Sequence, residues 1–271
     1  MLSNLIADQV EPVCINSLVG SQIASSRVWL DDVLGFESSD LYSNELLAMR
    51  PKVYEWSNKQ SAELVFHKTH DANIEVSAGV NLFPPDSISK VVYIIRNPLD
   101  VVVSLSNHMS FSIDQAIMMM NKCDYVLAKE SHRSLYRQVG QPLHTWSHHV
   151  KSWVDNPQLG TCSIRYEDMQ AQPVNSFGAV ATYLGLSFNK DSLNNAIRSS
   201  SFDALSAQET AEPFNERSLK SKSFFRKGTV GNWRTTLDNS QIGQIVDQHH
   251  EIMRRFGYVD ETNQPLGGGQ V

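Results

Sequence analysis

Three stretches of the sequence place cations beside turns, where an anion can bind. The first is YIIRNPLDVVVS, residues 93–104, in which an apolar run stops at Arg96 and an Asn-Pro turn follows. An arginine at the end of a parallel strand, beside a helix start, can bind a phosphate through its forked donors and the free helix N–H groups. Ser104, two turns further on, can add a hydroxyl. The alternative is that Arg96 pairs with Asp100 and that Ser104 is only a helix residue.

The second stretch is FFRKGTVGNWR, residues 224–234, which has two adjacent cations followed by two glycines. Arg226 and Lys227 supply the charge. Gly228 and Gly231 allow the backbone to wrap closely around an anion, because glycine accepts conformations that other residues avoid. The alternative interpretation is a basic surface turn with no ligand.

The third stretch is FHKTHD, residues 66–71, which brings a lysine and a histidine to the end of a predicted strand. Lys68 and His70 are two residues apart, so in extended backbone they point to the same side. A histidine near neutral pKa can remove a proton from a hydroxyl, and a nearby lysine can neutralise charge on a leaving oxygen. The alternative is that both residues lie in an exposed loop without a role.

Composition sets the broad class of protein. The chain has 271 residues with 41% hydrophobic and 19% charged residues, which is ordinary for a soluble globular protein. A net charge of −6 argues against a general nucleic-acid binder. The three scattered cysteines favour reduced thiols and a cytoplasmic location. We find no signal-peptide pattern and no apolar run long enough to span a membrane.

Strand and helix patterns alternate along the chain, which predicts an α/β domain with a mostly parallel central sheet sandwiched between helices. Strands are expected at residues 64–66 and 91–95, and the stretch 160–169 is expected to hold a third strand followed by a turn. Helices are expected in the stretches 112–130, 144–155, 175–186 and 240–258, and Gly185 is a plausible helix C-cap. The polar stretch 203–223 is expected to be a mobile surface loop. We predict one domain over residues 1–258 and a disordered tail over residues 259–271.

Together the three stretches resemble the sulfotransferases that use 3′-phosphoadenosine 5′-phosphosulfate (PAPS), over roughly residues 60–258. RNPLDVVVS is similar to their 3′-phosphate motif, and RKGTVGNW to their second such motif, usually R-K-G-x-x-G-D-W. KTH is similar to their catalytic Lys-x-His, and RYEDM to the Tyr-Glu-Asp after their third core strand. The stretch IASSRVWLDDVLGF resembles sequences of the bacterial branch of this family.

The resemblance implies a P-loop-like fold and a role for each matching residue. His70 is implied as the general base on the acceptor hydroxyl, and Lys68 as the group that stabilises the bridging oxygen of the leaving group. Tyr166 and Phe202 are implied to contact the adenine. The residues implied to hold the 3′-phosphate are Arg96, Ser104, Arg226, Lys227 and Gly228.

The sequence departs from the family pattern in two places. We find no Pro-Lys-Ser-Gly-like phosphosulfate loop, and residues 1–6 resemble the end of the helix that follows it, so we expect the N-terminal strand and loop to be missing. Asn232 stands where the family usually has Asp. These departures leave two alternatives to an active sulfotransferase. One is a remnant that binds 3′-phosphoadenosine 5′-phosphate (PAP) without turnover, and the other is a nucleotide kinase-like phosphotransferase.

The resemblance also implies what the protein binds. The expected partner is a small-molecule acceptor with a hydroxyl or amine, and PAPS is the expected co-substrate, without a metal. The histidine pairs 148–149 and 249–250 invite a metal interpretation, but no carboxylate or cysteine falls at ligand spacing, and helix histidines explain them better. No signal identifies the acceptor or the oligomeric state.

Overall fold

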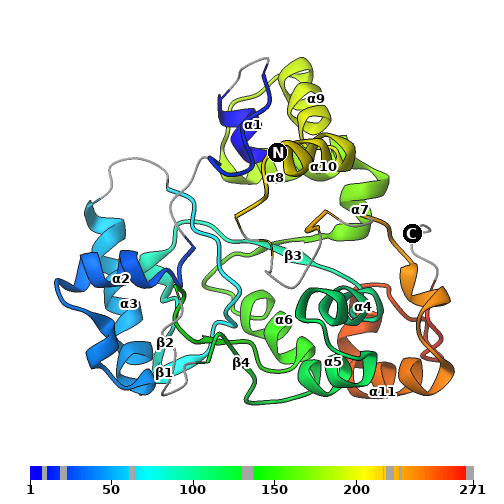
Figure 1. The fold of residues 1–271 in the computed structure, drawn as a ribbon, viewed down its shortest axis with the longest axis horizontal. Coiled ribbons are helices and arrows are strands. Elements are labelled where there is room, and N and C mark those ends of the chain that lie inside the picture. The colour runs from blue at the N-terminus through cyan, green and yellow to red at the C-terminus, as the bar shows by residue number, and fades with distance from the viewer. Residues whose placement is uncertain are drawn as a thin grey trace. The chain divides into compact units, whose positions relative to one another are not determined.

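The chain folds into two compact units in a computed structural model (Figure 1). The first unit comprises residues 1–19, 94–120 and 162–271, and the second comprises residues 20–93 and 121–161. Both units use separate stretches of chain, so the predicted single domain over residues 1–258 stays a prediction. The residues that the structure describes are 1–7, 11–18, 23–60, 65–129, 137–215, 217, 223–225 and 228–266.

The first unit is mainly helical. Its helices include one group in which α1, α8 and α10 contact α9, and another in which α4, α5 and α11 contact one another (Figure 1). Its elements are α1 (Leu2–Ala7), α4 (Pro98–Met109), α5 (Ile113–Met120), β6 (Cys162–Arg165), α7 (Tyr166–Ala171), α8 (Pro173–Leu184), α9 (Lys190–Ser199), α10 (Phe202–Ala211), the 3-10 helix η3 (Asn232–Thr235) and α11 (Asn239–Arg255).

The second unit has a core of stacked aromatic rings. The ring of Tyr54 lies 5.8 Å from that of Trp29 and 4.8 Å from that of Phe83, which in turn lies 5.2 Å from Trp153. The elements of this unit are α2 (Arg27–Leu34), η1 (Ser38–Asp40), α3 (Ser43–Gln60), β1 (Glu75–Ser77), β2 (Val80–Asn81), η2 (Pro85–Ser87), β4 (Val126–Leu127), β5 (Gln141–Pro142) and α6 (Trp146–Val154).

The strongest predicted strand is confirmed as β3 (Val92–Ile95), which is the hydrogen-bonded neighbour of β6. The prediction of an α/β fold with a parallel sheet is also confirmed. Two further strand pairs, β1–β2 and β4–β5, are antiparallel. The strand predicted at 64–66 is wrong for Val65 and Phe66, which form no strand, and Leu64 lies outside the described residues. Just after this segment, the carbonyl of Lys68 accepts a backbone hydrogen bond from the Ala24 N–H.

Local sequence signals set several helix ends where we predicted them, but the helix expected over 112–130 ends at Met120, and Val126–Leu127 form β4 instead. The Asn97 side chain accepts a hydrogen bond from the Leu99 N–H and caps α4, with Pro98 in the first turn. Ser112 and Gln115 exchange the two hydrogen bonds of a capping box at the start of α5. Gly185 ends α8 with a φ of 76°, a left-handed conformation that glycine adopts without strain.

Two expectations drawn from polar composition differ from the structure. Residues 203–211 of the expected loop form most of α10, because Ser201 caps the helix and Ala, Leu, Gln and Glu favour helix. Residues 259–266 of the expected disordered tail fold back, with Val259 bridged to Pro265 and the Leu266 N–H bonded to the Tyr258 carbonyl. Val259 is buried.

None of the described helices combines the length and the apolar character needed to cross a bilayer.

We predict that His249 of α11 makes the stability of the protein sensitive to pH. Burial lowers the pKa of His249 to about 4, whereas its ordinary value is 6.5. As the pH falls below 6.5, the unfolded chain therefore binds a proton before the folded chain does, and stability is lost between the two values. Urea unfolding at about pH 7 and about pH 5 measures the effect. The free energy of unfolding should fall between these two pH values by about 2 kcal/mol less in His249→Gln than in the wild type.

The control is His250→Gln, which makes the same replacement at the exposed neighbouring histidine of the same helix. Identical pH slopes for the wild type and His249→Gln would contradict the assignment.

Candidate functional site

Arg96, just beyond β3, contacts the second phosphate motif and Tyr166 of the Tyr-Glu-Asp segment. Its Nη2 donates a hydrogen bond of 3.2 Å to the carbonyl of Thr229. Its guanidinium carbon lies 4.4 Å from the centre of the Tyr166 ring, within the range of a cation–π contact. Its Nε is buried and has no hydrogen-bond partner within the described part of the chain. The guanidinium is therefore held in place while one donor is unsatisfied.

Asp100 joins the two predicted phosphate motifs. Its side chain is buried at 2% exposure, and it does not pair with Arg96 as the alternative interpretation expected. Oδ2 accepts a hydrogen bond of 2.7 Å from the Gly231 N–H, and Oδ1 accepts one of 3.1 Å from the Trp233 N–H. The carboxylate thus fixes the second motif to the first turn of α4, which is a role that the sequence did not reveal.

Gly228 packs directly against Phe202, at the start of α10. A Cβ added to Gly228 would lie only 2.3 Å from the Phe202 ring, and its φ is +61°. Glycine is therefore required at this position for two reasons, close approach and backbone conformation. The Tyr166 hydroxyl donates to the Gly228 carbonyl at 3.4 Å. Both predicted adenine contacts therefore meet the second phosphate motif.

The loop between Gly228 and Gly231 has N–H groups available for a ligand. Within the described residues, no hydrogen bond uses the backbone N–H of Gly228, Thr229 or Val230. Consecutive N–H groups of this kind form concave sites for anions. Two predicted phosphate ligands, Arg226 and Lys227, lie outside the described residues.

Ser104 is exposed on α4, and no contact joins it to the other predicted ligands within the described residues. Its predicted role stays a prediction.

Glu167, the second residue of the YED sequence, braces the end of β3. Its carboxylate is buried and accepts a 2.9 Å hydrogen bond from the Asn97 N–H and a 3.0 Å hydrogen bond from the Tyr258 hydroxyl. It therefore holds the turn that follows Arg96. The sequence signalled this residue only through the family motif, and its two partners are 70 and 91 residues away.

The predicted catalytic pair lies in the second unit. Lys68 and His70 are both exposed, in a segment without regular structure. Their backbones are anchored, because the Lys68 carbonyl accepts from the Ala24 N–H at 2.8 Å. The His70 carbonyl is held by a ring nitrogen of His149 at 2.9 Å. The side chains can therefore face solvent or a substrate from a fixed backbone.

A buried ion pair anchors the residue next to His70. Arg50 and Asp71 are both fully buried, and two hydrogen bonds of 2.9 and 2.8 Å join their side chains. Burial alone would lower the pKa of Arg50, but Tyr54 and Asp71 outweigh it and hold that pKa above its ordinary value. The Asp71 carbonyl also accepts a 2.9 Å hydrogen bond from the Trp153 indole. The sequence alone revealed neither this pair nor its link to the segment that carries Lys68 and His70.

His149 supports the backbone of His70 through hydrogen bonds at both of its ring nitrogens. Because a carbonyl only accepts, the His149 Nε2 that bonds to the His70 carbonyl carries the proton. Its Nδ1 then accepts from the Tyr93 hydroxyl at 2.9 Å. Burial lowers the pKa of His149, and the hydrogen bond to His70 offsets this only in part. At neutral pH the ring is therefore neutral and its tautomer is set.

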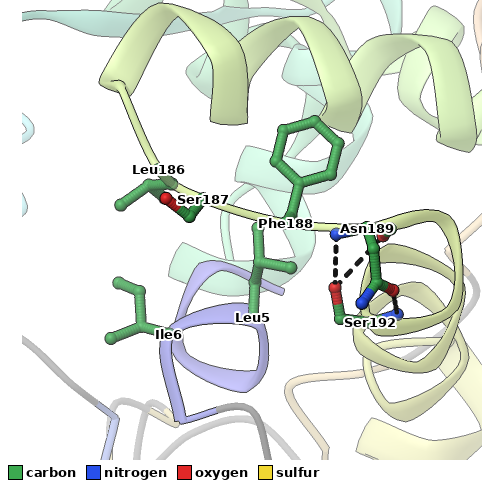
Figure 2. Close-up of a pocket in the computed structure, with 7 residues that line it drawn as sticks. All are labelled: Leu5, Ile6, Leu186, Ser187, Phe188, Asn189 and Ser192. Carbon is green, nitrogen blue, oxygen red and sulfur yellow. Dashed lines mark hydrogen bonds between the residues drawn. The ribbon is translucent and has the colours of Figure 1, made fainter.

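A pocket of about 500 Å³ in the first unit contains none of the predicted site residues (Figure 2). It opens beside α1 and the turn from α8 to α9, and Leu5, Leu186 and Phe188 line it.

No cluster of three potential metal ligands occurs among the described residues.

Comparison with known proteins identifies the family. Residues 51–257, more than half of the chain, match the family model of the sulfotransferase domain. The chain belongs to the sulfotransferase family. The predicted bacterial branch is not tested by this match.

Two curated sulfotransferases illustrate the relationship. Cytosolic sulfotransferase 13 of Arabidopsis thaliana is 30% identical over 161 residues, which cover 56% of this chain and 48% of that protein. Sulfotransferase 2A1 of Rattus norvegicus is 29% identical over 183 residues, covering 63% of this chain and 58% of that protein. The sulfotransferase chain thus spans about half the length of the curated relatives it matches.

Solved structures show the same fold at low identity. Mouse sulfotransferase SULT7A1 complexed with PAP superimposes with a TM-score of 0.54 at 20% identity, covering 96% of this chain and 91% of that chain. Retinol dehydratase in a complex with retinol and PAP gives a TM-score of 0.52 at 21% identity, covering 71% and 54%. At this identity the likeness concerns the fold alone.

We predict that Asp71→Asn will lower the free energy of unfolding by about 3–5 kcal/mol, because it leaves the Arg50 charge buried without a counter-charge. Urea unfolding measures the change. The control is Glu55→Gln, which breaks the exposed Lys59–Glu55 pair of α3 and should leave stability unchanged. Equal effects of the two substitutions would show that the buried pair does not anchor this segment.

Proposed function

We propose that this protein transfers a sulfuryl group from PAPS to a hydroxyl or amine of a small molecule. The observation that carries the proposal is the position of Arg96, which contacts Thr229 of one predicted phosphate motif and the ring of Tyr166. Membership of the sulfotransferase family supports it, as does the likeness in fold to proteins solved with PAP.

In the proposed binding mode, Arg96 and the N–H groups from Gly228 to Val230 hold the 3′-phosphate. A charge-assisted arginine bond and a concave set of N–H groups both favour a dianion over water. Ser104, Arg226 and Lys227 are proposed to add further donors. Tyr166 and Phe202 are proposed to bind the adenine through their rings.

In the proposed reaction, His70 takes the proton of the acceptor hydroxyl as its oxygen forms a bond to the sulfur of PAPS. The bond from sulfur to the bridging phosphate oxygen breaks, and PAP leaves with the electron pair. Lys68 neutralises the charge that develops on that oxygen. No covalent enzyme intermediate or metal is needed, because positioning and charge stabilisation supply the catalysis.

Two other functions can be tested against this proposal. We find no Pro-Lys-Ser-Gly-like loop in the 271 residues, and such a loop would bind the phosphosulfate. A chain that binds PAP without turnover is therefore the second candidate. A kinase-like phosphotransferase is the weaker alternative, because the Gly-x-x-x-x-Gly-Lys sequence of such enzymes does not occur.

We place the activity in the cytoplasm and in the bacterial branch of the family, as the sequence favoured.

We predict that substitutions of His70 and Arg96 affect different quantities, turnover and PAP binding. His70→Ala should lower kcat by about 10²- to 10⁴-fold, which is the usual contribution of a general base, and leave the Kd for PAP unchanged. Arg96→Ala should raise the Kd for PAP by about 10- to 100-fold through loss of a charge-assisted bond. Calorimetry with PAP and a turnover assay measure the two quantities. If both variants weaken PAP binding equally, the division of roles is wrong.

A second prediction separates the candidate functions. PAP should raise the melting temperature, whereas ATP with magnesium should not, because only PAP carries the 3′-phosphate. Transfer of labelled sulfate from PAPS to a panel of hydroxyl and amine acceptors then distinguishes an active enzyme from a remnant. Stabilisation by ATP with magnesium and not by PAP would reverse the choice in favour of a phosphotransferase.

A further inference from the structure

Glu209 of α10 binds the chain just before the second phosphate motif. Its side chain is buried at 8% exposure. Oε1 accepts a hydrogen bond of 2.7 Å from the Phe224 N–H, and Oε2 accepts one of 2.9 Å from the Phe225 N–H. Both carboxylate oxygens are therefore used by consecutive backbone donors. This arrangement needs an acceptor with two oxygens and no proton of its own.

The other end of the motif is held in the same way by Asp100, through the N–H groups of Gly231 and Trp233. Two buried carboxylates thus fix the backbone before and after the N–H groups proposed to receive the phosphate. Since Asp and Glu are almost never fully buried without partners, each carboxylate strongly favours the conformation that offers it two donors.

Aromatic packing joins the Glu209 end of the motif to the proposed adenine site. The Phe225 ring lies 6.5 Å from that of Phe202 and 5.2 Å from that of Phe224. Phe202 begins α10, the same helix that carries Glu209, and its ring touches Gly228. A shift of residues 224–225 would therefore be transmitted to Gly228 both along the chain and through Phe202.

We propose that Glu209 is a positioning residue that sets the backbone of the second phosphate motif for a nucleotide bearing a 3′-phosphate. It acts through the N–H groups of Phe224 and Phe225 and does not touch the ligand. Its effect is on selectivity, because the motif it holds receives the 3′-phosphate and not the 5′-phosphate. The inference rests on the proposed function.

The test compares two ligands in one variant. In Glu209→Gln the amide keeps one acceptor oxygen but turns an NH₂ group toward the other backbone N–H. We expect the preference for PAP over adenosine 5′-phosphate, as a ratio of Kd values from calorimetry, to fall about tenfold, which corresponds to one lost charge-assisted bond. The Kd for adenosine 5′-phosphate should change much less than the Kd for PAP. A general loss of structure would weaken both ligands together.

The matched control is Glu212→Gln, which removes the same charge from the exposed C-cap of α10. It should keep the wild-type ratio, and so should Glu209→Asp in large part, because it keeps both carboxylate oxygens. An unchanged ratio in Glu209→Gln, while the wild type prefers PAP, would overturn the inference and leave the proposed function intact. A wild type without preference for PAP would overturn both.

A measurement on the wild type covers the case in which Glu209→Gln does not fold. Binding and backbone order are reciprocally coupled, so a ligand that uses the positioned loop must stabilise its anchor. PAP should slow hydrogen exchange at the Phe224 and Phe225 amides more than adenosine 5′-phosphate does. Equal exchange with the two ligands would contradict the role of Glu209.

Discussion

The geometry of the first unit depends on the buried carboxylate of Asp100. Among the described residues this carboxylate has no cationic partner, so its two backbone hydrogen bonds, from Gly231 and Trp233, must compensate for its desolvation. In doing so it ties together segments that are 131 residues apart in the sequence. It holds Gly231 close to the first turn of α4, and Thr229, two residues earlier, bonds to Arg96. The proposed binding of a 3′-phosphate therefore depends on an acid that does not contact the ligand.

The second unit follows the same physical pattern around its exposed reactive groups. Lys68 and His70 are exposed, whereas the Arg50 and Asp71 side chains beside them are fully buried. The Arg50–Asp71 pair anchors one side of the segment, and neutral His149 donates to the His70 carbonyl. A backbone held in this way suits a general base. The base must lie at a fixed distance from its substrate, and its side chain must remain accessible to accept a proton.

Features encoded locally could be predicted, and features made by distant contacts could not. The end of β3, the Asn97–Pro98 helix start and the Gly185 C-cap each depend on neighbouring residues, and all were predicted correctly. Arg96 was singled out because a cation at a strand end is unusual; the structure places it against Thr229 and Tyr166, and its binding role stays a prediction. Asp100, Glu167 and Glu209 were missed as anchors, since a carboxylate that accepts from a remote backbone has no sequence signature. Polar composition was misleading at α10 and at residues 259–266, where capping and return contacts impose order.

The most direct test of the central claim is a crystal structure of this protein with PAP. The account predicts that the 3′-phosphate lies within hydrogen-bonding distance of the Arg96 guanidinium and of the backbone N–H groups from Gly228 to Val230, with Asp100 still bound to Gly231 and Trp233. A 3′-phosphate that touches neither Arg96 nor this loop would contradict the account, even if PAP were bound tightly elsewhere.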